Sequence, residues 1–153
     1  HEVKIQMKIG KFVEDMSTMF QCCNSLAKID FTNFDTSNVV NMTNMFVHCQ
    51  ELTSINFTNF NTSQVRSMSG MFSKCSSLLN LDLKSFDTSE VLSMDWMFKK
   101  CCALTSINLN SFNTMQVRTM EGMFYKCRSL KKVNLANFNV SRVKTFKRLF
   151  SLA

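Results

Sequence analysis

The sequence repeats itself every 26 residues, and this period constrains the fold more than any other feature. The dipeptide Met-Phe recurs at this step without one insertion or deletion, as Met19-Phe20, Met45-Phe46, Met71-Phe72, Met97-Phe98 and Met123-Phe124, with Leu149-Phe150 as an altered sixth copy. In the first five copies a cysteine follows the Phe after three residues and a leucine after six. A unit of this size cannot bury its own apolar face, so neighbouring units must stack.

The segment after each leucine predicts a short strand. Apolar residues alternate there with polar ones, as half-buried strands require. The inward pairs are Ile29 and Phe31, Ile55 and Phe57, Leu81 and Leu83, Ile107 and Leu109, and Val133 and Leu135.

The rest of each unit predicts a helix. Its start is an Asp or Asn suited to a helix N-cap, at Asp35, Asn61, Asp87, Asn113 and Asn139. Three of the five copies add Gln or Glu in the capping-box position, and Phe34 and Val39 have the spacing of a hydrophobic staple. From Val39 the apolar stripe continues through Met42, Met45, Phe46 and Cys49 at helical spacing.

The consensus LxxIxLxxF[DN]TSxVxxMxxMFxxC contains the strand signature of leucine-rich repeats. In detail, the stretch FDTSNVVNMTNMFVHCQELTSINF resembles the BspA-like, or DUF285, branch of those families, and the resemblance extends from about Val3 to Phe150. It implies a cell-surface or secreted, adhesin-type role in which a microbe binds host or neighbouring-cell components. That step is analogy, because a fold does not determine a function.

We therefore predict an α/β repeat solenoid, leucine-rich-repeat-like, with one short parallel strand and one helix in each 26-residue unit. A single domain over residues 1–153 would contain about six units. They are a degenerate first unit 1–23, units 24–49, 50–75, 76–101 and 102–127, and a degenerate last unit 128–153. The ends depart from the pattern, with Lys8 in place of a staple Phe and Phe146 in place of a Met. With His1 at its start and no convincing polar cap, the chain is expected to be a piece of a longer array or to pair end to end.

Neither the thiols nor the other reactive side chains predict a catalytic or metal site. The odd number of cysteines, seven, argues against a disulfide framework, and thiols spread one per layer argue against zinc. We interpret the repeat cysteines as small buried packing residues, with an inter-layer disulfide as the alternative, and expect Cys22 and Cys102 to be exposed and reactive. No spacing matches a nucleophile with a base, and the glycines are isolated, so we predict no enzymatic activity, cofactor or metal.

Methionine is the other abundant sulfur residue, with 12 copies. Most of them occupy two ladder positions in every unit, and we predict that these are core residues rather than a binding groove.

The outward positions of the strands are the predicted partner-binding surface. One row is Lys28, Ser54, Asn80, Ser106 and Lys132, and another is Thr32, Thr58, Lys84 and Asn110, with Ala136. Between them is a row of Asp30, Asn56, Asp82, Asn108 and Asn134. Stacked amides can bond one another along such a row, so we favour the two flanking rows for contact with a partner.

The net charge of +7 is concentrated at the C-terminal end. From Arg118 onward the sequence has one acidic residue, Glu121, and nine basic residues. The basic residues are Arg118, Lys126, Arg128, Lys131, Lys132, Arg142, Lys144, Lys147 and Arg148. This patch could attract a polyanion, or it could simply be a solvated face.

The main hypothesis is a non-enzymatic interaction module that binds a protein or glycan on its strand face. A polyanion binder that uses the basic patch and a purely architectural scaffold are the alternatives. Nucleic acid is disfavoured because the Phe residues belong to the core. No apolar run approaches the roughly 18 residues of a membrane span.

Overall fold

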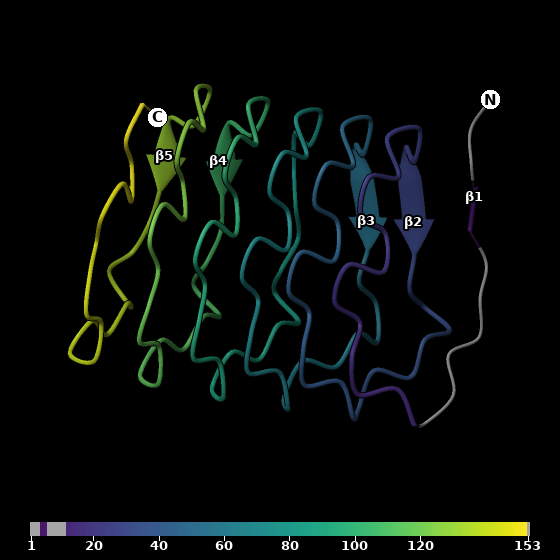
Figure 1. Ribbon diagram of the computed structural model, residues 1–153, viewed down its shortest axis with the longest axis horizontal. Coiled ribbons are helices and arrows are strands. Elements are labelled where there is room, and N and C mark those ends of the chain that lie inside the picture. Colours follow the sequence, from purple (N-terminus) through teal and green to yellow (C-terminus); the bar gives the residue numbers. More distant parts are fainter. Residues whose placement is uncertain (1–3, 6–11, 153) are drawn as a thin grey trace.

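The computed structural model describes residues 4–5 and 12–152. Successive units lie side by side as layers along the longest axis, in chain order from the N-terminal end to the C-terminal end (Figure 1). The strands are β1 (Lys4–Ile5), β2 (Lys28–Asp30), β3 (Ser54–Asn56), β4 (Ser106–Ile107) and β5 (Lys132–Val133).

The strands pair in parallel with a register of one repeat. Lys28 pairs with Ser54 and Ile29 with Ile55, so each residue lies beside its equivalent in the next unit. The order β1-β2-β3 forms one sheet and β4-β5 a second. Between β3 and β4, the described residues 79–83 form no strand, and the strand predicted around Leu81 is therefore wrong for that unit.

The helix predicted in every unit is also wrong, because no helix occurs within residues 4–5 and 12–152. The segment that follows each Asp or Asn is a run of turns. Alternate amides there donate to carbonyls of the next layer: Met42 to Ser67 at 3.0 Å, Asn44 to Ser69 at 2.8 Å and Phe46 to Met71 at 2.9 Å. Of the amides between them, Met45 closes a turn to the carbonyl of Met42, three residues back, and Thr43 donates to the Asn41 side chain.

Backbone dihedrals explain why a helix cannot form. Asn44 and His48 have positive φ, 56° and 66°. The same two positions are positive in the layers that contain Gly70, Trp96 and Gly122. A left-handed residue every fourth position interrupts an α-helix, and it is the conformation that a type II turn places at its third residue. We call the stacked segments 14–23, 40–49, 66–75, 92–101, 118–127 and 144–152 the turn ladder.

The core is a set of ladders of identical residues. Six phenyl rings stack nearly parallel through all the layers, with neighbouring centroids 5.3 to 5.7 Å apart, and they belong to Phe20, Phe46, Phe72, Phe98, Phe124 and Phe150. Met42 and Met45 and their equivalents are fully buried, apart from the partly buried Met19. The prediction that the ladder methionines are core is confirmed.

The residues predicted as N-caps do bind backbone amides, although no helix follows them. Asp35 Oδ1 accepts the N–H of Ser37 at 3.1 Å, and Asp87 does the same for Ser89 at 2.9 Å. This is the local turn that Asx side chains form readily. A capping pattern therefore marks a turn in this chain and not a helix start.

Several expectations concern residues outside the described ranges or have no direct test. Lys8 and the first residues of unit 1–23 lie outside the described residues, and the unit boundaries remain predictions. At the other end Phe146 is exposed and Leu149 partly buried.

Candidate functional site

The strand face presents the predicted partner-binding rows. Lys28, Ser54, Asn80, Ser106 and Lys132 are all exposed. Thr58, Lys84 and Asn110 are exposed as well, and Thr32 is half-buried. Because β2 pairs with β3 and β4 with β5 in the one-repeat register, equivalent side chains lie next to each other within each sheet.

The Asp and Asn row between them is engaged within the protein. The Asn56 amide donates across the layers to Asp30 Oδ1 at 3.1 Å and to Thr32 Oγ1 at 3.0 Å. Its own Oδ1 accepts the N–H of Thr58 at 3.0 Å. These bonds are the stacking interactions expected for this row, and they hold the flanking side chains in place.

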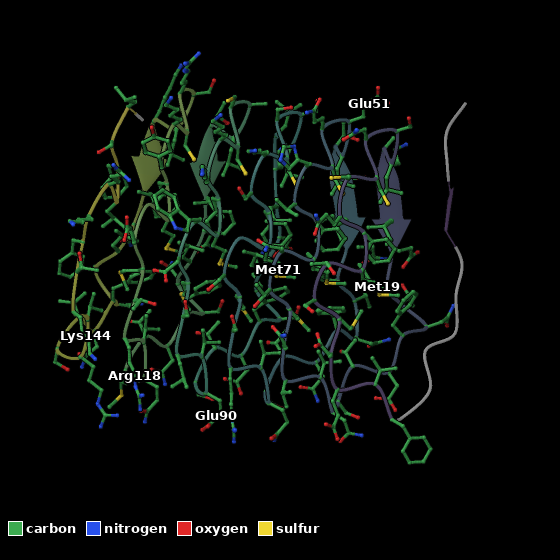
Figure 2. The ribbon with its side chains drawn as sticks, in the orientation of Figure 1. Met19, Glu51, Met71, Glu90, Arg118 and Lys144 are labelled. Atoms are coloured by element: carbon green, nitrogen blue, oxygen red, sulfur yellow. The ribbon has the colours of Figure 1, made fainter. Side chains whose placement is uncertain are left out.

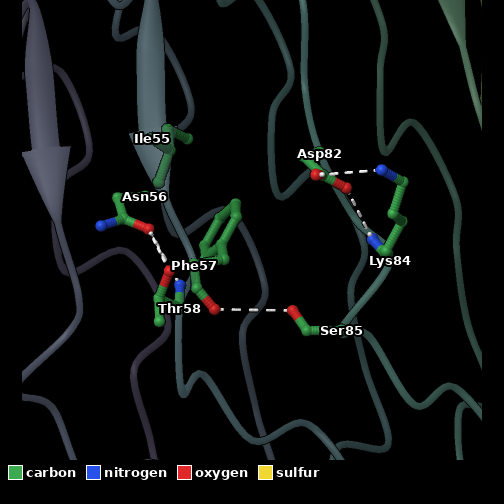
Figure 3. Close-up of a pocket in the computed structure, with 7 residues that line it drawn as sticks. All are labelled: Ile55, Asn56, Phe57, Thr58, Asp82, Lys84 and Ser85. Atoms are coloured by element: carbon green, nitrogen blue, oxygen red, sulfur yellow. Dashed lines mark hydrogen bonds and ion pairs between the residues drawn. The ribbon is translucent and has the colours of Figure 1, made fainter.

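A pocket opens where the sheet is interrupted. It has a volume of about 210 Å³ and is lined by Ile55, Asn56, Phe57, Thr58, Asp82, Lys84 and Ser85. Residues 55–58 of one layer face residues 82–85 of the next across it (Figure 3). Ser85 Oγ donates to the Phe57 carbonyl at 3.5 Å, and Lys84 lies 3.6 Å from Asp82 in an exposed ion pair. Thr58 and Lys84, both predicted from the sequence, thus share one concave site.

A second concave region lies on the turn ladder, and its key residues were not predicted from the sequence. It has a volume of about 410 Å³ and its lining includes Gly70, Lys74, Trp96 and Lys99. Trp96 is the single tryptophan of the chain. The available signal was that Trp96 and Tyr125 replace small or polar residues at repeat positions that the core does not use.

The family described as "Mycoplasma protein of unknown function, DUF285" matches residues 6–106 and 49–153. The chain belongs to the DUF285 family. The resemblance noted in the sequence is thus confirmed.

Other comparisons add little to this assignment. A solved structure of a T. pallidum leucine-rich repeat protein is similar at 20% identity with a TM-score of 0.49, covering 84% of this chain and 66% of that one. The DUF285 chain therefore spans slightly less than two thirds of that protein. No curated protein matches. No helix in the described residues is long and apolar enough to cross a membrane.

Four of the five repeat cysteines of this DUF285 chain are buried packing residues that also form hydrogen bonds, and the fifth, Cys23, is only partly buried. Cys49, Cys75, Cys101 and Cys127 are fully buried. Each thiol donates to a phenylalanine carbonyl one layer back, as Cys75 does to Phe46 at 3.2 Å. Burial, reinforced by a neighbouring thiol, raises the pKa of Cys49 to about 12, and burial likewise raises the pKa of Cys127 to about 12.

All seven cysteines are free thiols, so the inter-layer disulfide is absent. Cys22 is exposed as predicted, whereas Cys102 is only partly exposed. Among the described residues, no three His, Cys, Asp or Glu side chains come together as a metal site.

The nine basic residues of the predicted patch do not form one surface. Arg118 and Lys144 lie along one long edge of the molecule near Glu90, far from Glu51 at the opposite edge (Figure 2). Lys132 is on the strand face, and Lys126 lies over the Tyr125 ring on the turn ladder, 5.2 Å from its centroid. Arg142 donates to Gln116. The remaining four, Arg128, Lys131, Lys147 and Arg148, are exposed.

Proposed function

We propose that this DUF285 chain is a non-enzymatic interaction module that binds a macromolecular partner, a protein or a glycan, on its strand face. We place it at the cell surface or in a secreted protein, in an adhesin-like role. The repeat family supports an interaction role, because stacked repeats offer extended binding surfaces.

The pocket at the sheet interruption is the observation that carries this proposal. It hollows the strand face beside Thr58 and Lys84, between residues 55–58 of one layer and residues 82–85 of the next (Figure 3). A second hollow, of about 370 Å³, lies at the C-terminal end of this face, and Lys132 and Val133 are among the residues that line it. A concave site flanked by regular rows lets a partner insert a side chain and align the rest of its surface. The ion pair of Lys84 with Asp82 is exposed and therefore weak, so a partner can replace it at little cost.

The polyanion alternative is less well supported. A polyanion gains most from cations that line one surface, because each neutralised charge adds to the same electrostatic attraction. Here Arg118 and Lys144 lie along an edge while Lys132 is on the strand face.

The test is binding of the fluorescently labelled protein to cultured epithelial cells, measured by flow cytometry. The strand-face variant carries Ser54→Ala, Thr58→Ala, Lys84→Ala and Lys132→Ala, and it therefore changes the pocket together with its flanking rows. All four side chains are exposed, so the fold should persist. The matched control carries Arg118→Ala and Lys144→Ala, which also removes two positive charges.

We expect saturable binding by the parent protein, loss of binding in the strand-face variant and parent-like binding in the control. Loss in the control alone would favour the polyanion alternative. Unchanged binding in both variants would leave the strand face without a role and favour the architectural scaffold.

A further inference from the structure

The turn ladder carries an aromatic and cationic cluster that the proposed function does not use. The Trp96 and Tyr125 rings lie 5.8 Å apart between centroids at an interplanar angle of 86°. The Lys99 ammonium is 4.6 Å from the centroid of Trp96 and 5.9 Å from that of Tyr125. Trp96 and Lys99 also line the groove, together with Gly70 and Lys74 of the preceding layer.

Side chains of the preceding layer lie over the two glycines of this region, Asn44 over Gly70 and Trp96 over Gly122. A Cβ added at Gly122 would lie 2.1 Å from Cζ3 of Trp96, so the indole ring lies directly over that glycine. Both Gly70 and Gly122 have positive φ, 63° and 55°, and a substitution would be strained at either. The groove beside Trp96 has a volume of about 410 Å³, which is large enough for a small ring-shaped ligand.

The groove has a surplus of positive charge. Lys74 and Lys99 line it, and the Lys74 ammonium donates to His48 Nε2 at 2.6 Å, which fixes its position. The pKa of Lys99 is lowered, first by burial and then by the charges of Lys74, Lys100 and Arg148. An anion would relieve this repulsion.

One acidic side chain, Asp95, lines the same groove. Its Oδ1 accepts the Glu121 N–H at 2.6 Å, and its Oδ2 accepts the Ser93 hydroxyl at 3.2 Å. These bonds hold the carboxylate within the layer stack and leave the lysines as the groups that attract a ligand.

The rest of the lining is neutral, and apart from Val47 and Gly70 it is polar: Thr43, Asn44, Ser69 and Ser73 contribute hydroxyl and amide groups that can donate and accept. The hydroxyls of Thr43 and Ser69 also bond Ser67 and Ser93 in the neighbouring layers, at 2.7 and 2.6 Å. An aromatic side chain beside hydroxyl-bonding groups and two ammonium groups suits a polyhydroxylated ring that carries a negative charge.

We propose that this groove binds an acidic saccharide, with a sugar ring beside Trp96 and its carboxylate or sulfate paired with Lys74 and Lys99. Single-stranded nucleic acid fits less well, because such strands stack successive bases on aromatic platforms. Trp96 and Tyr125 meet edge to face and do not form two parallel platforms.

The experiment is titration of the protein with a heparin tetrasaccharide at low salt. Fluorescence of Trp96, the single tryptophan, reports the groove directly. The test variant is Lys74→Gln with Lys99→Gln, and the two single variants serve if the double variant does not fold. The matched control is Arg118→Gln with Lys144→Gln, which removes the same charge outside both the groove and the strand face. A neutral tetrasaccharide and an oligo-dT of similar charge are titrated in parallel.

We expect a saturable change in Trp96 fluorescence with heparin. The affinity should be weaker by about tenfold or more in the groove variant and at most slightly changed in the control. The neutral sugar and the oligo-dT should bind more weakly. The proposal is overturned by an absent fluorescence change, by equal weakening in both variants, or by tighter binding of the oligo-dT or the neutral sugar. None of these outcomes bears on the strand face, so the two proposals can fail separately.

Discussion

Thr88 and Asn113 join two layers through reciprocal hydrogen bonds. The Thr88 hydroxyl donates to the Asn113 carbonyl at 2.9 Å and accepts the Asn113 N–H at 2.8 Å. The same position in other units, Thr36, Thr62 and Thr114, is also buried and also donates to the next layer. The Thr of the repeated [DN]TS motif is therefore an inter-layer connector.

Replacing Thr88 with Val should lower the free energy of unfolding by about 1–3 kcal/mol, because the backbone groups of Asn113 lose the buried Thr88 hydroxyl as their partner while the shape is kept. Urea unfolding followed by circular dichroism measures this. The exposed Thr105→Val is the control and should stay within about 0.5 kcal/mol of the parent. Equal stabilities for the two variants would show that the Thr88 bonds add nothing.

This connector illustrates what could and could not be predicted from the sequence. The 26-residue period, the core ladders, the parallel strands and the exposed rows follow from spacing alone. The helix does not, because the stripe of Val39, Met42, Met45 and Cys49 fits two structures. Turns closed to a carbonyl three residues back bury the same positions as a helical face.

The sequence feature that distinguishes the turn ladder from a helix is confined to one repeat position. Asn44, Gly70 and Gly122 occupy one repeat position, and these residue types tolerate positive φ. Thr18 and Trp96 occupy the same position, and because neither residue type favours positive φ, the pattern is not evident from the sequence. The groove at Trp96 could not be predicted either, because it depends on which repeat positions the turns expose.

Phe72→Ala tests the phenyl stack. Phe72 is fully buried between Phe46 and Phe98, with centroids 5.7 and 5.6 Å away, so truncation leaves a cavity that the neighbouring layers cannot fill. We expect a loss of about 3–5 kcal/mol in the free energy of unfolding. Phe146→Ala, at a 47% exposed position, should cost far less. A parent-like melting curve for Phe72→Ala would exclude the stack as a source of stability.

Gly122→Ala tests the packing of Trp96 on the turn ladder. The added methyl group collides with the indole ring and meets positive φ, so we expect a loss of about 1–3 kcal/mol and a shift in tryptophan emission. The same substitution made together with Trp96→Ala should cost less, since only the backbone strain remains. Additive effects in this double-mutant cycle would mean that the ring does not lie over Gly122.

The buried thiols predict a fall in stability at alkaline pH. Burial raises the pKa of Cys49 from its ordinary 9.0 to about 12. Above pH 9 the unfolded chain therefore releases a proton that the folded chain keeps. The contribution of the protonated Cys49 thiol to the free energy of unfolding is complete below pH 9. It is lost as the pH rises toward 12, by up to about 1.4 kcal/mol per pH unit.

Urea unfolding between pH 8 and 11 measures this effect, and comparison with Cys49→Ala isolates it from other groups that titrate there. The stability of the parent should fall more steeply than that of the variant. Exposed Cys22→Ala is the control and should follow the parent. Parallel curves for the parent and Cys49→Ala would contradict a buried, protonated thiol.

The Phe72 amide donates to the Met97 carbonyl of the next layer at 2.9 Å. Detecting this hydrogen bond in solution is the most direct way to distinguish the turn ladder from a helix. Solution NMR detects such a bond as a scalar coupling between the amide nitrogen and the carbonyl carbon. We expect the Phe72 nitrogen to couple with the Met97 carbon, as in a parallel ladder between units. Coupling with the carbonyl carbon of Met68, four residues back, would show a helix in each unit and contradict the turn ladder.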